Sequence, residues 1–284
     1  MNDIKPPINP VDIYDRYLKL ESDESQIKRN IESGNRYSAS GAGLCKRKQW
    51  YAANNYKRKD TDANSIRKMR LGTLVGQDFD ESMKKIRRGY PLNTDLEILI
   101  EHPVSNDSYN LLGHFDLLVI KDKKGFLYDY KTCHDYTFKK ATGKILSKKN
   151  DKDNYAYQLG TYGFMIEESE LIECDEVVYM ANIYINKNDS KVKTKSIDLN
   201  YKEFAKVYWS SIQANQLELE PPPFGLNRFT PTYEWECGLY CNFVEHCNSP
   251  YKKKAKKWKE LKVFTKNVTS KGIGEESKID SLIK

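Results

Sequence analysis

Two aspartates and a lysine near the middle of the sequence have the residue types and spacing for metal-dependent chemistry. They lie in the segment GHFDLLVIKDKKGFLYDYKTC, which starts at Gly113. Two stretches rich in branched and aromatic residues flank a polar turn at 121–125, and this pattern predicts a β-hairpin. Because side chains alternate along a strand, Asp129 and Lys131 share one face of the second strand, and Asp116 comes from the first.

This combination suits the hydrolysis of a phosphodiester. Two carboxylates that face one pocket form a site for a hard divalent cation. A lysine beside them orients or activates a water molecule and offsets developing negative charge. A D-x-K triplet alone is common on exposed strand faces, so the hypothesis depends on the surrounding motifs.

Three motifs resemble those of the PD-(D/E)xK nuclease superfamily, in its RecB-type branch. They are Gly113-His114-Phe115-Asp116 for G-x-x-D, Asp129-Tyr130-Lys131 for (D/E)-x-K, and Gln158-Leu-Gly-Thr-Tyr162 for Q-x-x-x-Y. Gln158 and Tyr162 are four residues apart and so lie on one side of a predicted helix. The resemblance implies that Gln158 positions the catalytic lysine or the metal-bound water, and that Tyr162 contacts the substrate phosphate. It also implies that Asp116, Asp129 and the carbonyl of Tyr130 bind Mg²⁺ or Mn²⁺.

The sequence departs from the family at one metal-binding position. The family has a histidine four residues after the glycine that corresponds to Gly72, and an acid four residues further on. This sequence has Gly76 and Asp80 at those positions. Asp80, Gln77 or Glu81 could supply an oxygen ligand instead, which favours Mg²⁺ over softer metals. The alternative is that these side chains only face solvent.

Three of the six cysteines form a cluster near the C-terminal end of the sequence. Cys237, Cys241 and Cys247 have the spacing C-x3-C-x5-C, which indicates a metal site in a reducing compartment. The family pattern adds one cysteine before the core, here Cys45, and holds a [4Fe–4S] cluster through four thiolates. His246 is a poorer fourth ligand because it is adjacent to Cys247. The family usually has C-x2-C at the first spacing, so zinc stays an alternative metal.

The composition predicts a cytoplasmic protein without a membrane-spanning helix. Charged residues make up 31% of the 284 residues, and no apolar run approaches the ~20 residues of a membrane-spanning helix. The first residues lack the basic and apolar segments of a secretory signal. The segment 251–284 holds eleven lysines against four acids, which accounts for the net charge of +7. This basic tail either binds the DNA backbone or only increases solubility.

The remaining patterns predict alternating helices and strands. Helices are expected at 11–20, 23–31, 62–88, 154–168 and 201–218, with a further one in the segment 37–51 that contains Cys45. Strands are expected at 95–105, 174–185 and 191–199, in addition to the central hairpin. The lysine-rich passage at 137–153 is expected to be a solvated loop with some helix.

We therefore expect an α/β protein with a restriction-endonuclease-like core, in which helices flank a central mixed β-sheet. The core is expected at 37–250, closed by the four-cysteine segment, after a helical extension at 1–36 and before the tail at 251–284. The resemblance implies a Mg²⁺- or Mn²⁺-dependent deoxyribonuclease, an exonuclease on single-stranded DNA ends. The sequence is similar to the CRISPR-associated and phage iron–sulfur exonucleases. This similarity implies protein partners in a recombination or spacer-acquisition complex. The alternatives are a DNA-binding or complex-forming protein that keeps the fold with little or no catalysis, and a zinc-stabilised structural module.

Overall fold

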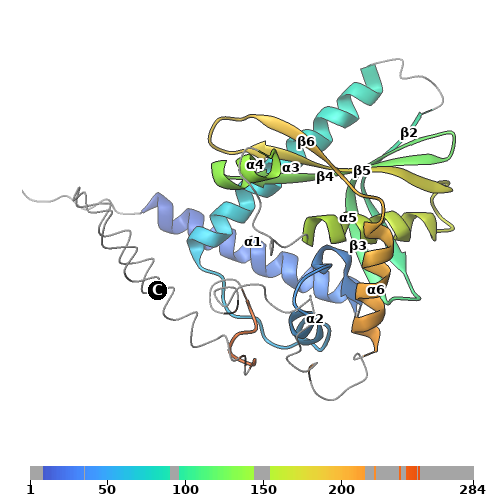
Figure 1. The fold of residues 1–284 in the computed structure, drawn as a ribbon. Coiled ribbons are helices and arrows are strands. Elements are labelled where there is room, and N and C mark those ends of the chain that lie inside the picture. Colours follow the sequence, from blue (N-terminus) through green and yellow to red (C-terminus); the bar gives the residue numbers. More distant parts are fainter. Residues whose placement is uncertain are drawn as a thin grey trace, which may run out of the picture. The chain divides into compact units, whose positions relative to one another are not determined.

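The computed structural model describes residues 9–34, 36–89, 96–143, 154–214, 221, 237, 241–247 and 249. The chain divides into two compact units. The larger unit contains Met1–Tyr56 and Asp60–Pro223, and the smaller contains Lys57–Lys59 and Phe224–Lys284. All helices and strands named below belong to the larger unit (Figure 1). The predicted basic tail lies outside the described residues.

A six-stranded mixed sheet forms the centre of the larger unit (Figure 1). Its strands are β1 (Tyr37–Ser38), β2 (Leu96–Asn106), β3 (Leu111–Lys121), β4 (Lys124–Cys133), β5 (Glu176–Asn186) and β6 (Val192–Ile197). The order is β1-β3-β4-β5-β6, and β2 also pairs with β3. The pairs β1–β3 and β4–β5 are parallel, and the other three are antiparallel. The expected central mixed sheet is therefore present.

The central hairpin of β3 and β4 turns over two residues. Asp122 and Lys123 both have positive φ, 50° and 60°, as a type I′ turn requires. Leu118 and Leu127 lie opposite each other in the ladder, and both side chains are fully buried. This apolar pair fixes the register, because a shift by one residue would turn both leucines to the other face of the sheet.

The two strands of the hairpin separate before they reach the predicted carboxylates. Their ladder ends at the pair of Leu117 and Tyr128. From there β4 continues beside β5, and β3 continues beside β2. In the fork, the backbone N–H of Tyr130 donates to Oδ2 of Asp116 at 2.6 Å, which satisfies a donor that the ladder leaves unpaired.

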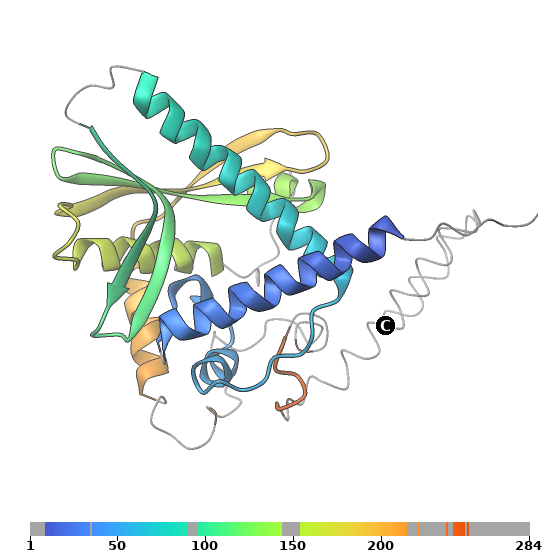
Figure 2. The same ribbon diagram turned by 180° about the vertical axis from the view of Figure 1, so that it is seen from behind.

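Two helices cover opposite faces of β4. Gln158 of α5 (Asn154–Glu167) bonds to Asp129 and Lys131, whereas Phe79 of α3 (Ala63–Gly89) packs on Tyr130. Successive residues of a strand point to opposite faces, so α5 and α3 lie on different sides of the sheet. Figure 2 shows α3 in front of the strands and α5 behind them.

Helix α5 is the most deeply buried helix described. Residues 156–166 are all buried, and α6 (Tyr201–Gln213) packs on its outer side. Gly160 makes this approach possible, because any Cβ there would overlap the carbonyl oxygen of Tyr201. The indole N–H of Trp209 donates to the hydroxyl of Thr161 at 2.9 Å and fastens the two helices in the core.

Two expectations for the first fifty residues were wrong in detail. The two predicted helices are one helix, α1 (Pro10–Ser33), because no glycine or proline interrupts the polar stretch between them. Cys45 does not lie inside a helix but is the N-cap of α2 (Lys46–Ala53). The preceding segment forms β1 and a 3₁₀ turn, and Gly43 follows with a φ of 71°, which is incompatible with a continuing α-helix.

The lysine-rich passage after β4 begins with a short helix, α4 (Asp135–Ala141), and its residues 144–153 lie outside the described part of the chain. No helix in the described residues has both the length and the apolar character needed to span a membrane.

Candidate active site

A cavity of about 640 Å³ opens where β3 and β4 separate. Its walls come from α3, β2, β3 and β4, namely Gly72, Thr73, Gly76, Gln77, Asp80, Glu101, Asp116, Tyr130, Lys131 and Thr132. Three carboxylates and one ammonium group are among these residues. The cavity therefore combines acids from three elements with the lysine of the D-x-K motif.

Small residues of α3 leave room in the cavity. A Cβ at Gly76 would meet no atom within 4 Å, so the cavity is open at the position where the resemblance expects a histidine. At Gly72 a Cβ would lie 3.2 Å from the hydroxyl oxygen of Thr132, which shows how closely this part of α3 approaches β4.

Asp116 and Asp80 are held in a low-dielectric part of the cavity wall. Burial, and then the charge of Asp129, raise the pKa of Asp116 from 3.8 to about 7, although the Tyr130 N–H bond opposes this. Asp80 is only 5% exposed, and burial raises its pKa as well. Its Oδ1 has no hydrogen-bond partner among the described residues.

Asp129 does not line the cavity but forms a closed set of contacts with Lys131 and Gln158. Its carboxylate is 2% exposed, and Nζ of Lys131 lies 2.5 Å from Oδ2. Gln158 donates from Nε2 to Oδ1 of Asp129 at 3.1 Å and accepts at Oε1 from Lys131 at 3.1 Å. Burial lowers the pKa of Lys131, but the ion pair with Asp129 outweighs burial and raises it. The lysine is therefore a cation rather than a base.

The remaining predicted site residues, on α3 and α5, differ in whether they line the cavity. Tyr162 is 2% exposed, is not among the cavity-lining residues, and packs against Gly113, where a Cβ would lie 2.8 Å from its ring. Gln77 lines the cavity, whereas Glu81 is exposed and pairs with Lys84 at 3.6 Å.

The four predicted cluster cysteines belong to different units of the chain. Cys45 is in the larger unit, and the other three, Cys237, Cys241 and Cys247, are in the smaller. All six cysteines are described, and none is in a disulfide. Sγ of Cys237 lies 3.4 Å from the hydroxyl oxygen of Ser249. The four-thiolate cluster stays a prediction.

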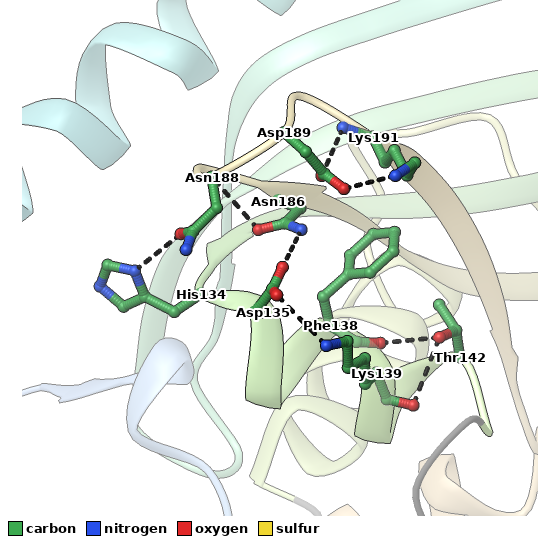
Figure 3. Close-up of polar contacts among 9 residues, drawn as sticks. All are labelled: His134, Asp135, Phe138, Lys139, Thr142, Asn186, Asn188, Asp189 and Lys191. Atoms are coloured by element: carbon green, nitrogen blue, oxygen red, sulfur yellow. Dashed lines mark hydrogen bonds and ion pairs between the residues drawn. The ribbon is translucent and has the colours of Figure 1, made fainter.

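A polar cluster joins the turn after β5 to α4, the helix that follows β4 (Figure 3). Asn186 at the end of β5 donates from Nδ2 to Oδ1 of Asp135 at the start of α4, at 2.7 Å. The next residue, Lys187, donates its backbone N–H to the carbonyl of Cys133 at 2.9 Å and its ammonium to the carbonyl of Lys68 at 3.4 Å. The turn after β5 thus holds β4 and α3 together.

Glu101 is the cavity residue that the sequence analysis missed. It lies in β2, within the segment LEILIEHPV, and has a φ of 47°. The available signal was an acid that directly follows the apolar run Ile98-Leu99-Ile100 in the middle of a predicted strand.

No family model matches the chain, and no curated protein matches it. Several solved structures are similar. The crystal structure of SSO0001 is 14% identical with a TM-score of 0.46, covering 83% of this chain and 96% of that one. An alkaline exonuclease from Laribacter hongkongensis is 13% identical with a TM-score of 0.34, covering 64% of this chain and 88% of that one. Its complex with dAMP gives 15% identity and a TM-score of 0.35, with 65% and 89% covered.

These identities and TM-scores are too low to assign a chemistry to this chain. Among the described residues, no group of three or more His, Cys, Asp or Glu side chains is arranged to hold a metal ion. The donors are nevertheless all oxygen atoms, the kind that Mg²⁺ and Mn²⁺ prefer. The unpartnered Oδ1 of Asp80 also fits such an ion, because a buried carboxylate oxygen requires a partner.

Proposed function

We propose that the protein is a metal-dependent deoxyribonuclease that hydrolyses phosphodiesters in this cavity. The observation that carries the proposal is the position of Lys131. Lys131 lines the cavity together with Asp116, and its ammonium is paired with the buried Asp129. A fixed cation next to cavity-lining carboxylates suits the hydrolysis of a phosphodiester with a divalent ion.

Four groups are the proposed donors to the ion: the carboxylates of Asp116, Asp129 and Asp80, and the carbonyl of Tyr130. When bound, Mg²⁺ or Mn²⁺ lowers the pKa of a water molecule and neutralises charge on the scissile phosphate. Asp129 would share its carboxylate between this ion and Lys131, which it contacts at 2.5 Å.

Lys131 orients the attacking water and offsets the charge that develops on the phosphate. It is suited to these roles because it stays protonated beside Asp129. Gln158 is a positioning residue, since it bonds to both members of the ion pair and limits the rotamers of each. For Tyr162, contact with the substrate phosphate stays part of the proposal.

Basic residues near the cavity favour a polyanionic substrate. Lys68 and Arg70 lie four and two residues before the cavity-lining Gly72 on α3, and the ammonium of Lys187 donates to the Lys68 carbonyl. Lysine and arginine contacts to phosphates supply the sequence-independent part of DNA binding. We propose single-stranded DNA ends as the substrate, as the family resemblance implies.

A [4Fe–4S] cluster held by Cys45, Cys237, Cys241 and Cys247 belongs to the same proposal. It would close the core at 37–250 and have a structural role. A brown anaerobic preparation that absorbs near ~400 nm supports the cluster. A colourless protein with stoichiometric zinc contradicts it.

Cleavage of end-labelled single-stranded DNA in the presence of Mn²⁺ or Mg²⁺ tests the function. Asp129→Asn and Lys131→Met should each lower the rate by at least about 100-fold, because each removes a charge that the transition state needs. Asp122→Asn and Lys124→Met change exposed residues at the far end of the same hairpin and should cleave like the wild type.

A chelator should abolish cleavage by the wild type. If Asp129→Asn cleaves as fast as the wild-type protein, the nuclease proposal fails. DNA binding without any metal-dependent cleavage would instead support the alternative, a DNA-binding protein that keeps the fold.

A further inference from the structure

Glu101 faces Asp116 across the β2–β3 ladder. Ile100 pairs with Leu117 and His102 pairs with Phe115, so the register on both sides places Glu101 opposite Asp116. The pair itself is absent from the ladder, and both residues line the cavity. Two like charges in directly opposed positions of a sheet destabilise it.

The backbone at Glu101 is also in an unfavourable conformation. A φ of 47° places it in the left-handed region, which residues other than glycine, asparagine and aspartate seldom occupy. No described residue forms an ion pair with Glu101, and the nearby Lys84 pairs with Glu81. Position 101 thus combines a strained backbone with a carboxylate that lacks a counter-ion among the residues described, and a cation in the cavity would offset the repulsion between the two carboxylates.

Asp80 provides an independent indication of a ligand in the same cavity. Its side chain enters from α3, is 5% exposed, and has an Oδ1 without a partner in the described part of the chain. A buried carboxylate oxygen in that state is rare in native proteins unless an ion or a water molecule completes its contacts.

We propose that Glu101 and Asp80, together with Asp116, hold a divalent cation at the cavity wall. Glu101 is then a metal-ligating residue from β2, an element to which the sequence motifs assign no function. These three ligands are carboxylates of three different elements, which suits Mg²⁺ or Mn²⁺ rather than a softer metal. The inference deepens the proposed nuclease function and rests on it for the role of the ion, but ion binding is measurable without DNA.

Calorimetric titration of the full-length protein with Mn²⁺ tests the site. Glu101→Gln and Asp80→Asn should each weaken Mn²⁺ binding by about 10-fold or more, because each removes one charged ligand. Glu97→Gln and Asp78→Asn are matched controls, since both acids lie on the same strand and helix but do not line the cavity. The controls should bind Mn²⁺ like the wild type.

A second measurement separates lost ligation from lost folding. In a chelator, Glu101→Gln should melt at the same temperature as the wild type or higher, because the repulsion with Asp116 is gone. Added Mn²⁺ should then raise its melting temperature less than it raises that of the wild type. Wild-type Mn²⁺ affinity in Glu101→Gln, or an equal melting shift, overturns the inference.

Different results would refute the cation site and the nuclease function. If Mn²⁺ binding depends on Glu101 and Asp80 but no DNA is cleaved, the cation site stands and the nuclease function is wrong. If cleavage requires Asp129 while Glu101→Gln binds Mn²⁺ normally, the nuclease function stands and the site assigned to Glu101 is wrong.

Discussion

The substitution Asp116→Asn should make the metal-free protein more stable at neutral pH while removing its function. The folded state raises the pKa of this carboxyl from 3.8 to about 7, chiefly through burial and then through the charge of Asp129. Asparagine has the same shape, is neutral, and keeps an oxygen that accepts the Tyr130 N–H bond. The variant therefore removes the buried charge without removing the contact.

The size and the pH dependence of the effect follow from linkage. Below a pH of about 3.8 the carboxyl is protonated in both the folded and the unfolded state, so the substitution should be nearly neutral. As the pH rises to about 7, only the unfolded state readily loses the proton, and the wild type loses stability. The full shift corresponds to about 4 kcal/mol, and we expect about 2–4 kcal/mol in practice, because relaxation and water reduce such effects.

Urea unfolding in a chelator, repeated from about pH 4 to about pH 8, measures this difference. The free energy of unfolding of Asp116→Asn minus that of the wild type should rise from near zero to a plateau above about pH 7. The exposed Asp78→Asn on α3 controls for the loss of one negative charge and should show no such rise. Added Mg²⁺ should stabilise the wild type more than the variant. A difference that does not change with pH, or a variant less stable at pH ~8, would refute the reasoning.

Two further predictions concern glycines. Gly76→His places an imidazole in an open part of the cavity, so Mn²⁺ binding should tighten by about tenfold relative to Mg²⁺ binding. Calorimetric titration measures both affinities, with Gly76→Ala as the control. Equal gains for the two ions, or no gain beyond that of Gly76→Ala, would contradict this prediction. Gly160→Ala should destabilise the protein by at least about 3 kcal/mol in urea, because its Cβ overlaps the backbone of α6. At Gly163 the nearest atoms to an added Cβ belong to the side chains of Lys202 and Met180, so Gly163→Ala should stay within about 1 kcal/mol of the wild type. Equal losses in both variants would refute this account of the α5–α6 packing.

The central hairpin shows what local pattern predicts well. Its strands, its turn and the position of Asp129 and Lys131 on one face follow from the alternation of side chains along a strand and from turn chemistry. Both act over a few residues. The same holds for α3 and α5, whose predicted ends agree with the structure to within a residue. The segment before α2 was mispredicted because its pairing partner, β3, lies some seventy residues away.

The cavity itself was decided by tertiary structure. The sequence determined that Asp116, Asp129 and Lys131 would lie on neighbouring strands, because periodicity is a local property. Only the fold decided that β3 and β4 separate just before these residues, so that Asp116 and Lys131 line a cavity and Asp129 does not. The fold also placed Glu101 opposite Asp116 and buried Tyr162, because both depend on strand register and helix packing between distant segments, which no local spacing encodes.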